Sequence, residues 1–145
     1  MADLIDNAIY AHLAGDANVA SMVADRIYPA DLPQEYLLPA LVYTRISFVQ
    51  QPTQTSRGLP NPRYQLDSYG EAHDDADLLA QYVSEALHCF AGQIVTGGKT
   101  YTIRAAFVEG WQGPQRQPMA ANPDNPDPGI YRAIQDFIIW HLEVV

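Results

Sequence analysis

Apolar residues recur at three- and four-residue steps in three parts of the chain, a spacing typical of amphipathic helices. The segment 2–14 has this spacing and is followed by Gly15, a residue that commonly ends a helix. A second, short helix is expected after Asp16, whose side chain suits the N-cap position. The strongest helical pattern covers residues 71–90, where the apolar stripe consists of Ala72, Ala76, Leu79, Val83, Ala86, Leu87 and Phe90.

Alternation of apolar and polar residues predicts strands elsewhere in the chain. The expected strands cover residues 41–49, 63–70, 100–111 and 130–145, together with a short hairpin strand at Ile94 and Val95. The connections are rich in proline or polar residues and are expected at 25–40, 50–62 and 112–129. The predicted order is α-α-β-β-α-β-β-β, an α+β fold in which helices pack on one face of an antiparallel β-sheet. We expect a single domain, 1–145.

Composition and charge narrow the class of protein. The chain has 145 residues, 48% of them hydrophobic, which is enough to bury a core. Its net charge of −9, with eight Lys and Arg, repels nucleic acid at long range. Cys89 is the only cysteine, so no internal disulfide is expected. The start of the chain lacks a signal-peptide pattern, and no apolar run reaches the ~20 residues that span a bilayer, so we expect a cytosolic product without membrane contact.

The segment Ala91–Ile103 contains Gly-Gly-Lys-Thr, the end of a phosphate-binding loop. The full motif also needs a glycine five positions before Gly98, where this chain has Gln93. The residues after Lys99 alternate as in a strand, so no helix N-terminus is available to bind phosphate. We therefore interpret Gly97 and Gly98 as the turn of a β-hairpin.

The run His73–Asp77 resembles a set of metal ligands, because His73 and Asp77 are spaced to share one helix face. Asp74 and Asp75, however, point elsewhere around such a helix. Carboxylates in a first turn are favoured by the helix dipole, which explains this run without a metal.

Two further candidates for chemistry are weaker. His88 and Cys89 could form a nucleophile and its base, but neighbours on a helix diverge by about 100°. We expect Cys89 to be a small buried hydrophobe. The segment Asn122–Gly129 contains aspartates but lacks the spacing of a calcium loop. The sequence therefore predicts no catalytic residue, no metal site and no cofactor.

Loops and aromatic residues favour a protein that binds other proteins. The two long polar loops, 50–62 and 112–129, each exceed ten residues and contain one arginine, Arg57 or Arg116. Tyrosine and tryptophan are common interface anchors, and the chain has nine tyrosines and two tryptophans. The predicted interface residues are Arg57, Arg63, Trp111, Arg116, Asp124, Asp127, Tyr131 and Trp140.

Four sequence blocks resemble the tail-completion, or tail-to-head joining, proteins of long-tailed bacteriophages. The segments Asp25–Pro29 ("DRIYP") and Leu38–Tyr43 ("LPALVY") are similar to the opening of that family. The segment Arg63–Gly70, followed by a long helix, and the closing Gly129–Trp140 match its later blocks in the same order. The resemblance covers nearly the whole chain and rests on the order and spacing of these blocks.

The resemblance implies a tail terminator, a structural virion protein without cofactor or catalytic residues. Such proteins form a homo-hexameric ring that caps the tail tube and joins it to the head-completion or neck protein, while DNA passes through the lumen without specific binding. It also implies a location at the tail–neck junction of the virion, after assembly in the host cytoplasm. Pro29, Pro39, Phe137 and Trp140 would then be fold determinants, the last two buried or at an interface.

Two alternatives remain open at the level of sequence. One is another neck component, a head-completion or stopper protein. The other is a metal-dependent hydrolase that uses His73, Asp74 and Asp77. If the long loops make assembly contacts, removing 50–62 or 112–127 should leave a folded protein that fails to assemble.

Overall fold

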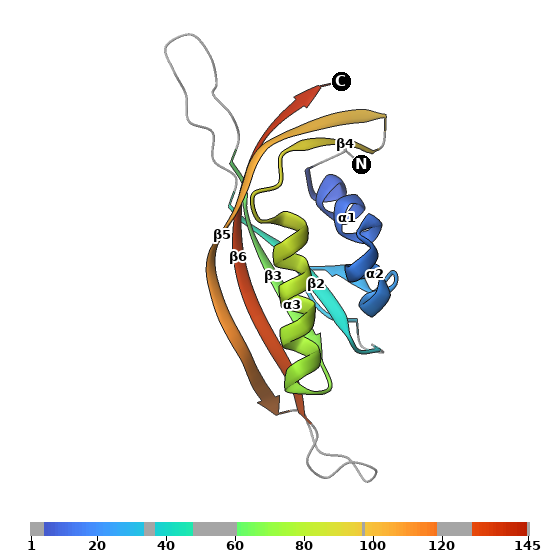
Figure 1. Ribbon diagram of the computed structural model, residues 1–145, viewed down its shortest axis with the longest axis vertical. Coiled ribbons are helices and arrows are strands. Elements are labelled where there is room, and N and C mark those ends of the chain that lie inside the picture. Colours follow the sequence, from blue (N-terminus) through green and yellow to red (C-terminus); the bar gives the residue numbers. More distant parts are fainter. Residues whose placement is uncertain (1–4, 34–36, 48–60, 97, 119–128, 145) are drawn as a thin grey trace.

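A six-stranded sheet forms one layer of the protein, in the order β1-β2-β3-β6-β5-β4 (Figure 1). The computed structural model describes residues 5–33, 37–47, 61–96, 98–118 and 129–144. The strands are β1 (Ile27–Pro29), β2 (Ala40–Ser47), β3 (Arg63–Gly70), β4 (Gly92–Thr96), β5 (Lys99–Pro118) and β6 (Gly129–Val144).

All neighbouring strands are antiparallel except β1 and β2, which are parallel. The long strands β5 and β6 pair from Thr100↔Val144 to Pro118↔Gly129, with β-bulges in β5. Such bulges bend a strand and increase its twist. The sheet curves accordingly, and the helices lie on its concave side (Figure 1).

Three helices are present among the described residues: α1 (Ile5–Gly15), α2 (Ala17–Val23) and α3 (His73–Leu87). The α2 helix has seven residues and is N-capped by Asp16, whose carboxylate accepts hydrogen bonds from the backbone N–H groups of Asn18 and Val19, both at 3.0 Å. Such an N-cap matters here because a helix this short forms few bonds of its own.

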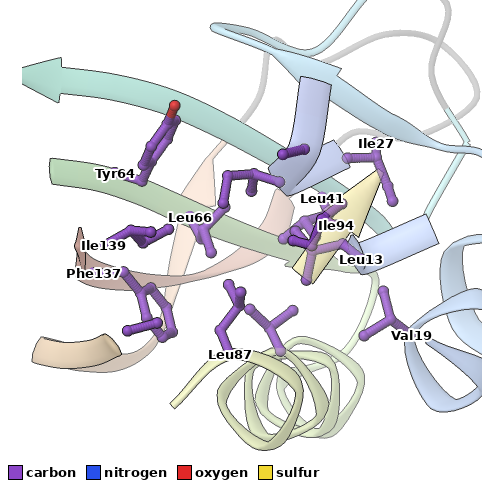
Figure 2. Close-up of a cluster of buried hydrophobic side chains, with 14 of the residues drawn as sticks. Leu13, Val19, Ile27, Leu41, Tyr64, Leu66, Leu87, Ile94, Phe137 and Ile139 are labelled. Atoms are coloured by element: carbon purple, nitrogen blue, oxygen red, sulfur yellow. The ribbon is translucent and has the colours of Figure 1, made fainter. Parts of the chain in front are cut away.

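The core lies between the sheet and the helices (Figure 2). The α3 helix contributes Leu79, Val83 and Leu87, and the facing residues of β3 and β6 alternate with outward ones, as the period of a strand requires. The hydroxyl of buried Tyr64 donates a hydrogen bond to Asp6 of α1. The largest fully buried side chains of the sheet are Tyr64, Tyr101, Phe137, Leu41, Leu66, Ile139 and Gln135.

The structure confirms the α+β class, with helices on one face of the sheet. Phe137 is fully buried, as expected. The hairpin is also confirmed, because Thr96 pairs with Lys99 and Gly98 has a φ of 79°. The strand that follows Lys99 excludes the helix that a phosphate-binding loop needs.

Three details of the prediction are wrong. The connection 25–40 contains the parallel strand β1, so the sheet is not purely antiparallel. The expected loop 112–129 begins later, because β5 continues to Pro118 along its partner β6. The third helix ends at Leu87 rather than at residue 90, which leaves Cys89 exposed instead of buried.

Candidate interaction surfaces

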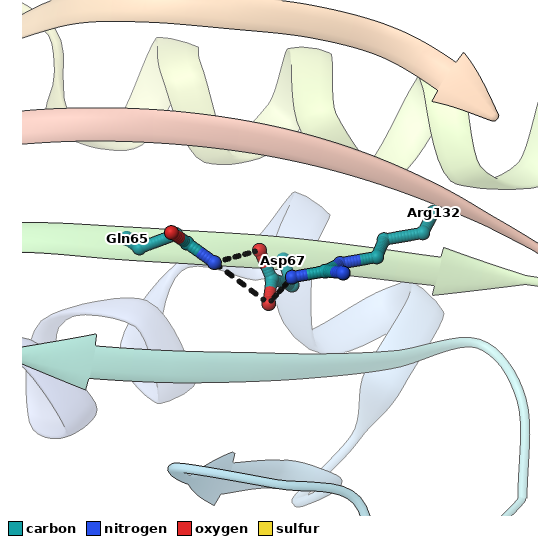
Figure 3. Close-up of polar contacts among 3 residues, drawn as sticks. All are labelled: Gln65, Asp67 and Arg132. Atoms are coloured by element: carbon teal, nitrogen blue, oxygen red, sulfur yellow. Dashed lines mark hydrogen bonds and ion pairs between the residues drawn. The ribbon is translucent and has the colours of Figure 1, made fainter.

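The face of the sheet opposite the helices carries polar and charged side chains that form hydrogen bonds and ion pairs with one another. Residues on this face alternate with the core residues of the same strands, so Gln65 and Asp67 of β3 point away from the helices. Figure 3 shows their side chains with that of Arg132 on the side of the sheet away from the helices. This outer face is the first candidate interaction surface.

Asp67 is the centre of this polar network. Its carboxylate accepts hydrogen bonds from Arg132 Nη2 at 2.8 Å and from Gln65 Nε2 at 3.1 Å (Figure 3). The residue is only 4% exposed. Burial raises the pKa of the Asp67 carboxyl, although the charge of Arg132 opposes this effect. The guanidinium of Arg132 also lies 5.9 Å from the ring centre of Tyr69, within the range of a cation–π contact.

An apolar strip lies farther along the same face. Phe107 of β5 pairs with Ile138 of β6, and Ala105 pairs with Trp140. Phe107 is 43% exposed, and Trp140 is half-buried. Arg63 of β3 reaches across the strip and forms an ion pair of 2.7 Å with Glu109 of β5.

Arg104 occupies the bulge in β5 beside this strip. It is exposed and has no ion-pair partner among the described residues. We call the whole set the outer patch: Arg63, Arg104, Phe107, Glu109, Ile138 and Trp140. Its combination of aromatic and arginine side chains is typical of interface hot spots.

A second group of polar and aromatic side chains lies on the helix side of the sheet, toward the end of β5 and the start of β6. Tyr131 pairs with Arg116, and its ring meets that of His73 edge-on at 5.9 Å. His73 in turn contacts the carboxylate of Asp74 at 3.3 Å. Trp111 faces the same side, opposite Gln135, and is 43% exposed. We call this set the helix-side patch: His73, Asp74, Trp111, Arg116 and Tyr131.

The structure thus divides the predicted interface residues between two surfaces. It places Arg63 and Trp140 in the outer patch, and Trp111, Arg116 and Tyr131 in the helix-side patch. Arg57, Asp124 and Asp127 lie outside the described residues. The sequence analysis did not include Arg104 and Phe107 among the interface residues. The alternation of the strand could have indicated Phe107, because it places this aromatic residue on the face away from the core.

The residues considered for chemistry do not converge on a catalytic site. The carboxylate of Asp77 accepts a hydrogen bond from Gln81, whereas His73 turns toward Tyr131. The described part of the chain contains no group of three or more His, Cys, Asp or Glu residues that could hold a metal ion. Nδ1 of His88 accepts a hydrogen bond from the backbone of Val108 at 3.1 Å, so this ring holds the end of α3 against β5.

One open cleft of about 370 Å³ lies between α1 and β4. His12 lines it, but its Nε2 is hydrogen-bonded to the Ala86 carbonyl at 2.8 Å and its ring stacks on Phe90 at 4.1 Å. Asp16, which also lines the cleft, is engaged as the N-cap of α2. The titratable side chains of the cleft, His12 and Asp16, therefore have structural tasks. No helix in the described ranges has the length and apolar character needed to cross a membrane.

Comparisons with known proteins identify the family and the fold of the chain. The sequence matches the family described as "Tail completion protein gp17" over residues 7–142. Curated proteins give no significant match. A chain of the solved structure titled "Virion of native gene transfer agent (GTA) particle" is similar with a TM-score of 0.66, at 16% identity, over 94% of this chain and 93% of that chain. At such low identity the likeness concerns the fold.

Proposed function

The chain belongs to the family of tail completion proteins called gp17, and from this premise we propose that it is a tail terminator. It forms a hexameric ring that caps the tail tube and joins it to the head-completion or neck protein. Residues 1–145 act as one such domain. The family match over residues 7–142 is the observation that carries this proposal.

Family membership supports a structural role in a phage tail rather than catalysis. The structural similarity supports a virion role, since a neighbour with this fold is part of the virion of a gene transfer agent particle. We propose that the protein assembles in the host cytoplasm and ends at the tail–neck junction of the virion. Its partners are further copies of itself, the major tail tube protein and the neck protein.

The distribution of charge supports a ring through which DNA passes without binding. None of the three helices contains a lysine or an arginine, whereas α3 contains Asp74, Asp75, Asp77 and Glu85. The whole chain has a net charge of −9. DNA has about one negative charge per 1.7 Å of duplex, so an acidic surface repels it.

The mass of the purified protein in solution, measured by light scattering over a range of concentrations, tests the proposal. A six-subunit species is expected, and negative-stain images should show rings. If the protein is monomeric alone, the measurement is repeated with tail-tube protein of the same particle, where rings should appear at tube ends. A protein that stays monomeric in both experiments contradicts the proposal.

A further inference from the structure

We infer that the outer patch of one copy of this chain docks on the helix-side patch of the next copy. This inference rests on the proposed function, because it identifies the contact by which the ring closes. A closed ring is built from heterologous contacts, in which two different surfaces of one subunit meet two neighbours. The chain must therefore present two complementary surfaces that face different directions.

The two patches meet this requirement by their position. The outer patch lies on the helix-free face of the sheet, and the helix-side patch lies on the opposite face. Ile138 of the first and Tyr131 of the second are seven positions apart on β6, which corresponds to about 24 Å. They cannot meet within one molecule, but a rotation between successive copies can bring them together.

The side chains of the two patches are complementary in kind. The outer patch presents Phe107, 43% exposed, and the helix-side patch presents Trp111 with the same exposed fraction. Burying two such aromatic side chains against each other stabilises an interface. The strip around Phe107 is bordered by the Arg63–Glu109 pair, which is already neutralised and can form a polar rim.

The outer patch contains an exposed arginine, and the helix-side patch contains an exposed aspartate besides Arg116, which has an interaction of its own. Arg104 of the outer patch has no acidic partner within the described chain, and Asp74 of the helix-side patch has a fully exposed side chain that contacts only the ring of His73. The arginines of the described chain lie on the strands or the segment before β1, whereas the helices contain only acidic residues among Asp, Glu, Lys and Arg. A contact between two helix faces would therefore bring like charges together, whereas a contact between sheet and helices brings arginines to acidic side chains. A second copy of this chain fits each patch.

A charge swap within one chain tests the pairing. Arg104→Glu and Asp74→Lys should each weaken self-association about tenfold or more, measured by sedimentation velocity. The double variant R104E/D74K reverses both sides of every contact and should return to within about threefold of the wild type. Glu85→Lys, at the other end of α3, is the matched control and should leave association unchanged.

An apolar pair of variants tests the strip itself. Phe107→Ser should weaken association about tenfold or more, whereas Val95→Ser, which removes a more exposed apolar residue on β4, should not. Circular dichroism and thermal melting establish that each variant is folded. If a variant does not fold, cross-linking of R104C with D74C, each in a C89S background, replaces it, since a disulfide between differently tagged chains requires that the two patches meet.

The outcomes separate the inference from the proposed ring. A wild type that assembles normally while D74K behaves like E85K, or a double variant no better than the single ones, overturns the pairing but leaves the ring intact. Failure of R104C and D74C to cross-link in assembled protein has the same meaning. A wild type that never associates, alone or with tail-tube protein, overturns the ring and the pairing together.

Discussion

Asp67 is a carboxylate placed on the open face of a sheet and yet almost entirely removed from solvent. Burial disfavours its charged form, and the net result is a pKa above the ordinary value in spite of Arg132. An unfolded aspartate has a pKa of about 3.9. As the pH rises from that value through the higher pKa of the folded state, the unfolded chain loses its proton first. Asp67 therefore lowers the stability of the fold as the pH rises through this window.

Asp67→Asn removes this titration but keeps acceptor and donor groups beside Arg132 and Gln65. We expect the free energy of unfolding of the wild type, relative to D67N, to fall as the pH rises above about 4, by about 1.4 kcal/mol for each unit by which the folded pKa is raised. Urea unfolding of both proteins at several pH values measures this. Asp75→Asn, at an exposed position of α3, reports the general effect of removing one carboxylate. A wild type that becomes more stable relative to D67N as the pH rises would contradict the argument.

Gly70 ends β3 where α3 packs against the sheet, and its lack of a side chain sets the distance between these two elements. A Cβ at this position would lie 2.7 Å from the backbone N of Ala76 and 2.9 Å from Cβ of Asp75. The first contact is with backbone, so the helix itself would have to shift. Gly70→Ala should lower the free energy of unfolding by about 1–3 kcal/mol, as overpacking usually does.

Gly15 provides the matched control for this prediction. A Cβ added there meets no atom within 4 Å, and the residue is the last of α1. Gly15→Ala should be neutral or slightly stabilising, because alanine is favoured over glycine in a helix by up to about 1 kcal/mol. Equal melting temperatures for G70A and the wild type would show that α3 is not held at this distance.

At the scale of secondary structure, some helices and strands could be predicted from their own residues and others could not. The pattern of α3 was sufficient to predict the helix, since every third or fourth residue faces the core. The end of the helix was not, because the apolar run continues to Phe90 while Cys89 turns to a φ of 62° and donates its N–H to the Ala106 carbonyl. That bond depends on β5, which lies far along the sequence.

The second half of β5 was missed for a related reason. Gly113 and Pro114 are typical of a loop, but here they lie in a bulge between Gln112 and Gln115, and β6 supplies the partner that keeps the strand extended. The parallel strand β1 has only three residues, too few for alternation to be recognised. The division of the interface residues between two faces likewise depends on the register of β5 and β6, which the sequence pattern does not specify.

At the scale of the whole molecule, the two long connections can be shortened to test their part in assembly. Pro118 pairs with Gly129, so residues 119–128 can be replaced by an Asn-Gly turn without a change of register. The strand residues up to Pro118 must be retained, which restricts the deletion suggested by sequence alone. In the other connection, Pro62 must also be kept, because its carbonyl accepts a hydrogen bond from Ile139.

The shortened hairpin should fold with an unchanged urea midpoint, since no described core residue is removed. If residues 119–128 contact the tail tube or the neck, the variant should still self-associate through the two patches but should no longer cap tubes in negative-stain images. Phe107→Ser should show a different defect, because it should weaken self-association itself. Because the two variants affect different contacts of one ring, a shortened hairpin that caps tubes normally would assign tube binding to another part of the chain.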